Sequence, residues 1–164
     1  RMLQPKHCSV VMLFDACHSG GAVDRDINDF LDVNIKPFST TLGTDEFKVA
    51  MIASCKPKQV SWEHEHVGGG LFTEALSMAL AEGRADAGMQ DQRVDVDELH
   101  AFVRRAVPEF LKDDTDYEEF KTPEFKSMRA QIKGIAAKKG LTAQQNPFAN
   151  FDSRQDLMPL LFLE

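Results

Sequence analysis

One short segment constrains the fold more than any other part of the chain. Residues 9–14, with the sequence SVVMLF, form a continuous apolar, β-branched run. Such a run is typical of a strand buried on both faces, as in a parallel sheet that helices cover. The sequence DACHSGG follows directly at residues 15–21, and its small residues and paired glycines predict a tight turn. Because ligands bind at the carboxyl edge of open α/β sheets, this turn is also where a site is expected.

The next elements continue the same pattern. After a polar stretch at residues 22–46, which we expect to be a long loop, residues 47–54 (FKVAMIAS) predict a second buried strand. Another polar loop, residues 55–70, ends in three glycines. A helix is predicted over residues 71–82, because apolar residues recur there at i, i+3, i+4, i+7 and i+8, and Gly83 follows as a suitable C-terminal residue.

The rest of the chain adds further helices and a final strand. Asp95 and Glu98 have the spacing of a capping box, so a second amphipathic helix should begin there, and Pro108 is expected to interrupt it. A basic helix is predicted over residues 125–139, and an edge strand over residues 157–163. This order of elements predicts an α/β fold with a mostly parallel sheet flanked by helices.

Composition excludes several functional classes. The net charge of -7 argues against a nucleic-acid partner and gives no reason to expect binding to an anionic membrane surface. No stretch approaches the ~20 apolar residues of a membrane span. The three cysteines are widely spaced and include no CxxC pair, so a disulfide framework is not expected. A reducing, cytoplasmic location fits this cysteine usage better.

Cys17 is the candidate nucleophile. It follows a buried strand and precedes two glycines, where backbone N–H groups can point at an anion. Such groups would favour the thiolate and could hold an oxyanion. A buried structural cysteine is the alternative, since free cysteine is among the most buried residue types. A flavodoxin-like fold with an anion or nucleotide at residues 19–21 is a further alternative.

Three segments resemble one family. Residues 15–20 resemble the D-x-C-H-S-G nucleophile motif of metacaspases and related caspase-like peptidases. Residues 53–61 (ASCKPKQVS) and 69–76 (GGLFTEAL) look like the family's strand, substrate-binding loop and G-x-F-T helix, in the family's order. Residues 91–103 resemble a segment that follows that helix in bacterial members. The resemblance covers roughly residues 8–110, and weakly the QNP sequence at residues 145–147.

The resemblance implies roles for particular residues. Cys17 would attack the scissile carbonyl to give a thioester, and Asp15 would line an S1 pocket that selects Arg or Lys. The substrates would be proteins or peptides, and no cofactor is implied. Gln59, Ser61 and Trp62 would lie on the strand that pairs with the substrate backbone, although Trp62 could equally be a packed core aromatic.

The chain departs from the family pattern at the catalytic base. Family members carry that histidine in an upstream H-G motif, and this sequence has no H-G. His7 precedes the first strand, and His18 follows Cys17, where its side chain would usually point away. We therefore expect residues 1–164 to be the C-terminal portion of one caspase-like peptidase domain, inactive without an N-terminal segment that carries the histidine. The alternative is a non-catalytic caspase-like scaffold or interaction module that retains Cys17.

No metal site is predicted. His64 and His66 are two residues apart in a loop without a third ligand. Asp91, Asp95 and Asp97 lack the glycine and the bidentate glutamate of a calcium loop, and a helix cap explains them better.

Overall fold

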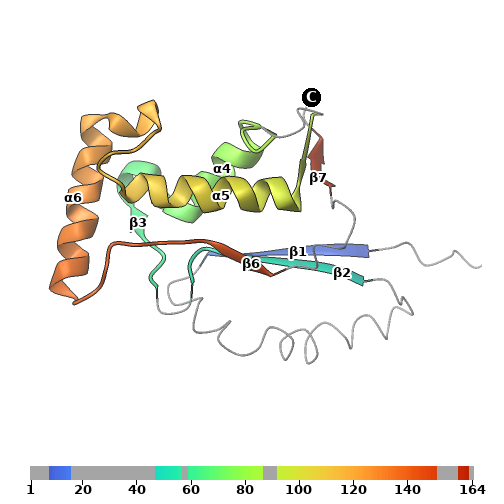
Figure 1. Ribbon diagram of the computed structural model, residues 1–164, viewed down its shortest axis with the longest axis horizontal. Coiled ribbons are helices and arrows are strands. Elements are labelled where there is room, and N and C mark those ends of the chain that lie inside the picture. Colours follow the sequence, from blue (N-terminus) through green and yellow to red (C-terminus); the bar gives the residue numbers. More distant parts are fainter. Residues whose placement is uncertain (1–7, 16–46, 57–58, 87–91, 151–158, 163–164) are drawn as a thin grey trace, which may run out of the picture.

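The fold is a mixed α/β arrangement, as the sequence predicts. The structure, a computed structural model, describes residues 8–15, 47–56, 59–86, 92–150 and 159–162. Within these residues, helices α4 and α5 lie over one face of a sheet with the strand order β1-β2-β6 (Figure 1). The elements are β1 (Cys8–Phe14), β2 (Phe47–Ala53), β3 (Glu63–His64), η2 (Glu65–Val67), β4 (Gly69–Gly70), α4 (Leu71–Leu80), β5 (Arg93–Asp95), α5 (Val96–Leu111), η3 (Glu118–Lys121), α6 (Pro123–Lys138), β6 (Phe148–Asn150) and β7 (Pro159–Phe162).

The two strands predicted first form the parallel part of the sheet. β1 and β2 pair in parallel, from Cys8 opposite Phe47 to Phe14 opposite Ala53. The ladder continues one step further, because the Ser54 backbone N–H donates to the Phe14 carbonyl at 2.8 Å. The described strands do not confirm a mostly parallel sheet, since their other pairings, β2 with β6, β3 with β4 and β5 with β7, are antiparallel.

The first helix buries most of its predicted apolar stripe, while Leu76 and Leu80 are only partly buried. α4 buries Leu71, Phe72, Ala75, Met78 and Ala79, and these residues join the main hydrophobic core. The helix ends two residues earlier than predicted, and the glycine expected after its end has a φ of 66°. A left-handed φ of this kind favours glycine, which explains why the chain can turn there.

The second helix begins at the predicted capping box. The Asp95 side chain accepts from the Glu98 N–H at 2.9 Å, and the Glu98 carboxylate accepts from the Asp95 N–H at 3.2 Å. The expected interruption at Pro108 is wrong, because α5 continues through it to Leu111. One more turn buries Phe110 completely and leaves Leu111 only 6% exposed. Burial of two large side chains outweighs the single backbone hydrogen bond that proline cannot donate.

The remaining elements lie around this core. α6, which begins two residues before the predicted basic helix, crosses the end of α5 (Figure 1). β7 confirms a strand near the C-terminus and pairs with β5. β6 was not anticipated from the sequence. Among the described helices, none is long and apolar enough to span a membrane.

Candidate active site

The site is built around Asp15, the first residue after β1. Its side chain is exposed, and each carboxylate oxygen accepts one hydrogen bond from a hydroxyl group. The Ser61 Oγ donates to Oδ1 at 2.8 Å, and the Thr73 Oγ1 donates to Oδ2 at 2.5 Å. Among the described residues no lysine, arginine or histidine pairs with this carboxylate. A fixed carboxylate that is open to solvent can bind a cation from outside the chain.

The first turn of α4 lies against the same carboxylate. Thr73 belongs to that turn, and Gly70 is the N-cap residue of the helix. A Cβ atom added to Gly70 would collide with the Asp15 Oδ2. Glycine is therefore required for this close approach rather than for an unusual backbone angle, since Gly70 has a φ of -73°. The positive end of the helix dipole favours a negative group at this position.

Gln145 donates a hydrogen bond to the Ser61 hydroxyl. Ser61 is only 2% exposed, and its Oγ accepts from the Gln145 Nε2 at 3.2 Å. The same amide nitrogen donates to the Ser54 carbonyl at 3.1 Å, while the Gln145 Oε1 accepts from the Trp62 N–H at 2.7 Å. We call Asp15, Ser61, Thr73 and Gln145 the edge cluster. It joins the ends of β1 and β2, the start of α4 and the segment before β6.

The predicted substrate-binding residue Gln59 bridges two chain segments. The Gln59 side chain is partly exposed, and its Oε1 accepts from the Asn146 N–H at 3.0 Å and from the Lys56 N–H at 3.3 Å. Its own N–H donates to the Lys56 carbonyl at 3.1 Å. The structure brings Gln59 to the same loop as Ser61. Its contact with a substrate stays a prediction.

Trp62 is packed in the core, with 6% of its surface exposed. Its carbonyl accepts from the Leu71 N–H at 2.9 Å, which ties the loop to the start of α4. Its indole nitrogen is buried and has no hydrogen-bond partner among the described residues. This burial agrees with the alternative of a packed aromatic, and a contact between Trp62 and a substrate remains untested.

Cys17, His18 and His7 lie outside the described residues, so the structure does not test their roles. Cys55, by contrast, is described: its thiol is fully buried and donates weakly to the Gln59 carbonyl at 3.4 Å. Within the described ranges, no three His, Cys, Asp or Glu side chains are grouped so that they could hold a metal ion. His64 instead caps η2, since its Nδ1 accepts from the His66 N–H at 3.1 Å.

Sequence analysis missed three residues of this site. Thr73 stands in the GLFT sequence, whose threonine could have been assigned a role once the helix start was predicted. Gly70 stands directly before that helix, where a third consecutive glycine signals a close approach. Gln145 lies in the QNP sequence, but nothing local shows that it reaches a loop more than 80 residues away.

The chain was compared with known proteins. A family model described as the caspase domain matches residues 2–138, which include Asp15, Cys17, Ser61 and Thr73 and end before Gln145. No curated protein and no solved structure matches the chain. The matched region covers more than half of the sequence and points to cysteine peptidase activity in general. The chain belongs to the caspase-domain family.

Proposed function

We propose that the chain is the cysteine-bearing portion of an endopeptidase that cleaves proteins after Arg or Lys. The observation that carries this proposal is the Asp15 carboxylate, fixed at the carboxyl end of β1 by Ser61 and Thr73. It stands two positions before Cys17 in the sequence. A pocket next to the nucleophile selects the side chain on the acyl side of the cleaved bond, so its charge sets the P1 preference.

The charge of the site favours a basic P1 residue. Each oxygen of Asp15 accepts one hydrogen bond from a hydroxyl group and keeps lone pairs for a further donor. A guanidinium can bind such a carboxylate through two parallel hydrogen bonds, and an ammonium can bind it as a point charge. An acidic P1 side chain would instead face a like charge without a compensating cation among the described residues.

Cys17 would carry the covalent step. Its thiolate attacks the carbonyl carbon of the scissile peptide, a C–S bond forms, and the C–N bond breaks. A protonated base gives its proton to the departing amine. Water then attacks the thioester and the base takes a proton from that water. The C–S bond breaks, which releases the acid product and restores the Cys17 thiolate beside the protonated base. The histidine base would come from a segment outside these 164 residues, and the complete enzyme would act in the cytoplasm.

The proposal is tested by covalent labelling of the complete protein. A peptide with Arg at P1 and a chloromethyl ketone at its carboxyl end should label Cys17, and its norleucine counterpart should not. Asp15→Asn should lower the labelling rate by about 100-fold, the cost of leaving a desolvated cation without its partner. Cys17→Ala should abolish labelling. Cys55→Ala is the matched control, because it removes a buried thiol and should leave labelling intact.

A non-catalytic scaffold is the second candidate, and one observation favours it. Asp15 already has a structural role, because it accepts from Thr73 at the start of α4 and needs no substrate to be stabilised there. On this alternative, the Arg peptide labels nothing, and Asp15→Asn lowers stability alone. Absence of labelling by the Arg peptide and by its Lys counterpart in the folded, complete protein would exclude the proposed peptidase and leave the scaffold.

A further inference from the structure

We propose that Gln145 is a positioning residue for Asp15: acting through Ser61, it fixes the plane of the carboxylate and makes the site prefer Arg to Lys. This inference rests on the proposed function, since it assigns a determinant of specificity to the same site. Gln145 lies outside the region that the caspase-domain model matches. It is 1% exposed, and the Ser61 hydroxyl connects it to Asp15 by accepting from Gln145 and donating to the carboxylate.

Two backbone groups fix which way the Gln145 amide points. Its oxygen faces the Trp62 N–H, and its nitrogen faces the Ser54 carbonyl. The reversed amide would place donor against donor at Trp62 and acceptor against acceptor at Ser54. In a site this buried, such mismatches cost several kcal/mol, on the order of 1–3 for each unsatisfied group. The nitrogen must therefore be the atom that faces Ser61.

This orientation determines what the Ser61 hydroxyl can do. An amide nitrogen is only a donor, so the Ser61 Oγ accepts from it and must direct its single proton elsewhere. The Asp15 Oδ1, 2.8 Å away, receives that proton. The same amide nitrogen donates to the Ser54 carbonyl, so the residue that follows β2 helps to hold the Gln145 amide in this orientation. The hydrogen bond from Ser61 to Asp15 thus depends on Gln145.

Two hydroxyl anchors fix the carboxylate plane, whereas one leaves it free to rotate. Ser61 holds Oδ1 and Thr73 holds Oδ2, so the two anchors come from different elements. A guanidinium that binds through two parallel hydrogen bonds needs this fixed plane. An ammonium is a compact point charge that tolerates rotation. Loss of the Ser61 anchor should therefore weaken Arg binding more than Lys binding.

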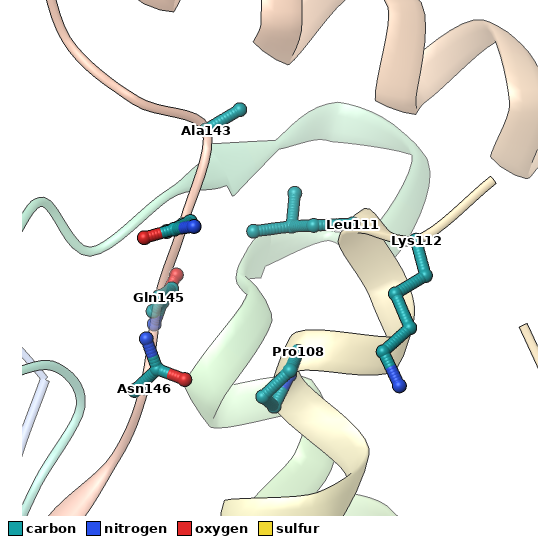
Figure 2. Close-up of a pocket in the computed structure, with 7 residues that line it drawn as sticks. Pro108, Leu111, Lys112, Ala143, Gln145 and Asn146 are labelled. Atoms are coloured by element: carbon teal, nitrogen blue, oxygen red, sulfur yellow. The ribbon is translucent and has the colours of Figure 1, made fainter.

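The segment that carries Gln145 is held by side-chain hydrogen bonds more than by packing on its far side. A cavity of about 330 Å³ separates residues 143–146 from the end of α5. Figure 2 shows Pro108 and Leu111 on one wall of this cavity and the segment from Ala143 to Asn146 on the other. On its near side, the Asn146 N–H donates to Gln59. The register of Gln145 against Ser61 is therefore set by these polar contacts.

Peptide binding to the complete protein with Cys17→Ala tests the inference without turnover. Three peptides that differ only at P1 are compared by calorimetry: Arg, Lys and the neutral Arg isostere citrulline. Gln145→Met should lower the ratio of Arg affinity to Lys affinity by on the order of 10-fold, the size of one hydrogen bond to a charged group. Ser61→Ala should lower it equally, and the double variant should lower it no further. Gln144→Met is the matched control, because this neighbouring side chain is exposed, and it should leave the ratio unchanged.

The outcomes separate the two proposals. If the parent protein binds the Arg and citrulline peptides equally, the proposed function fails. If it prefers Arg but Gln145→Met, with unchanged circular dichroism, keeps the full Arg-to-Lys ratio, the positioning role is overturned. Should Gln145→Met not fold, Gln145→Asn keeps a buried amide that is too short to reach Ser61, and a full ratio in that variant overturns the role. A full ratio in Ser61→Ala overturns it as well, because the proposed effect passes through that hydroxyl.

Discussion

The edge cluster and the polar groups at the C-terminal end of α5 are both anchored by a buried side chain, but they differ in where their charges lie. In the edge cluster the buried anchor is Gln145, which is neutral, and the charged group, Asp15, is exposed. At the end of α5 the buried groups are themselves charged: Glu109 is 4% exposed and Arg129 is 1% exposed. We call this second group the helix-end cluster.

The charged groups of the helix-end cluster are satisfied unequally. Glu109 accepts from the Thr115 hydroxyl at 2.9 Å and from the Asp116 N–H at 3.1 Å, and it also pairs with Lys112. Arg129 donates one hydrogen bond, to the Phe120 carbonyl at 3.0 Å, while its Nε and a second terminal nitrogen have no hydrogen-bond partner among the described residues.

The difference separates a site that can bind from a cluster that stabilises. Neutral donors hold the Asp15 carboxylate in place and leave it accessible, so its charge remains usable by a ligand. The buried Glu109 joins the end of α5 to the segment before η3, and the buried Arg129 joins α6 to η3. Variants in the helix-end cluster should therefore change the free energy of unfolding, whereas variants around Asp15 should change binding more than stability.

Arg129→Ala should give the largest loss of stability, about 3 kcal/mol, because it leaves a cavity under α6 where a long side chain was packed. Arg129→Met is the matched variant. It keeps most of the volume and removes two buried donors that have no hydrogen-bond partner among the described residues, and it loses only a 4.0 Å ion pair with the exposed Asp113, so it should change stability by less than about 1 kcal/mol or increase it. Urea unfolding of both variants measures these values. Equal losses would show that the charge, rather than the packing, makes Arg129 important.

Glu109→Gln should cost about 2 kcal/mol at neutral pH and progressively less in acid. Burial raises the pKa of Glu109. Hydrogen bonds from Lys112, Thr115 and the Asp116 N–H, together with the Lys112 charge, lower this pKa by more than burial raises it, so the net shift is downward. A lowered folded-state pKa contributes stability above the unfolded-state pKa, and that stability is lost as the pH falls through the folded value. The cost of losing charged hydrogen bonds is of this size.

Stability curves measured between about pH 7 and pH 3 test this dependence. Glu118→Gln is the control, because Glu118 forms the same i,i+3 pair with a lysine, Lys121, but is 85% exposed. It should change stability by less than about 0.5 kcal/mol at any pH. A cost for Glu109→Gln that stays constant down to pH 3 would contradict the proposed role of its charge.

Sequence patterns predicted the local parts of this molecule well. The capping box at the start of α5 and the apolar stripe of α4 each depend on residues three or four positions apart. A short stretch of sequence is therefore enough to predict them. The predicted first strand also placed Asp15 at the sheet edge. Pro108 misled because its local preference against a helix was overridden by the burial of Phe110 and Leu111.

The rest depends on contacts between distant parts of the chain. β6 is three residues long and pairs with β2, which is about 100 residues earlier, so no local run announces it. Gln145 joins Ser54 and Ser61 across more than 80 residues. A single glutamine in a polar segment gives no sign of its partners. The edge cluster could therefore be predicted at Asp15 and at Ser61, but not in the contacts that hold them.

The sharpest separation of binding from stability is expected for Gly70→Ala. Its new Cβ would displace the Asp15 carboxylate, which lies at the end of a side chain and can move, so unfolding should become easier by less than about 1 kcal/mol. Binding of the Arg peptide should nevertheless fall by about 10-fold or more, because Asp15 loses both hydroxyl anchors.

Gly134→Ala is the matched control, since Gly134 lies inside α6 with nothing within 4 Å of an added Cβ. There the substitution should stabilise the protein by about 0.5–1 kcal/mol, because alanine loses less entropy in a helix, and peptide binding should not change. Two identical substitutions should thus have opposite effects on stability, and only one should affect binding. If Gly70→Ala bound the Arg peptide as tightly as the parent protein, the close approach of Asp15 to α4 would have no part in recognition, and the edge cluster would be a stabilising cluster like the one at the end of α5.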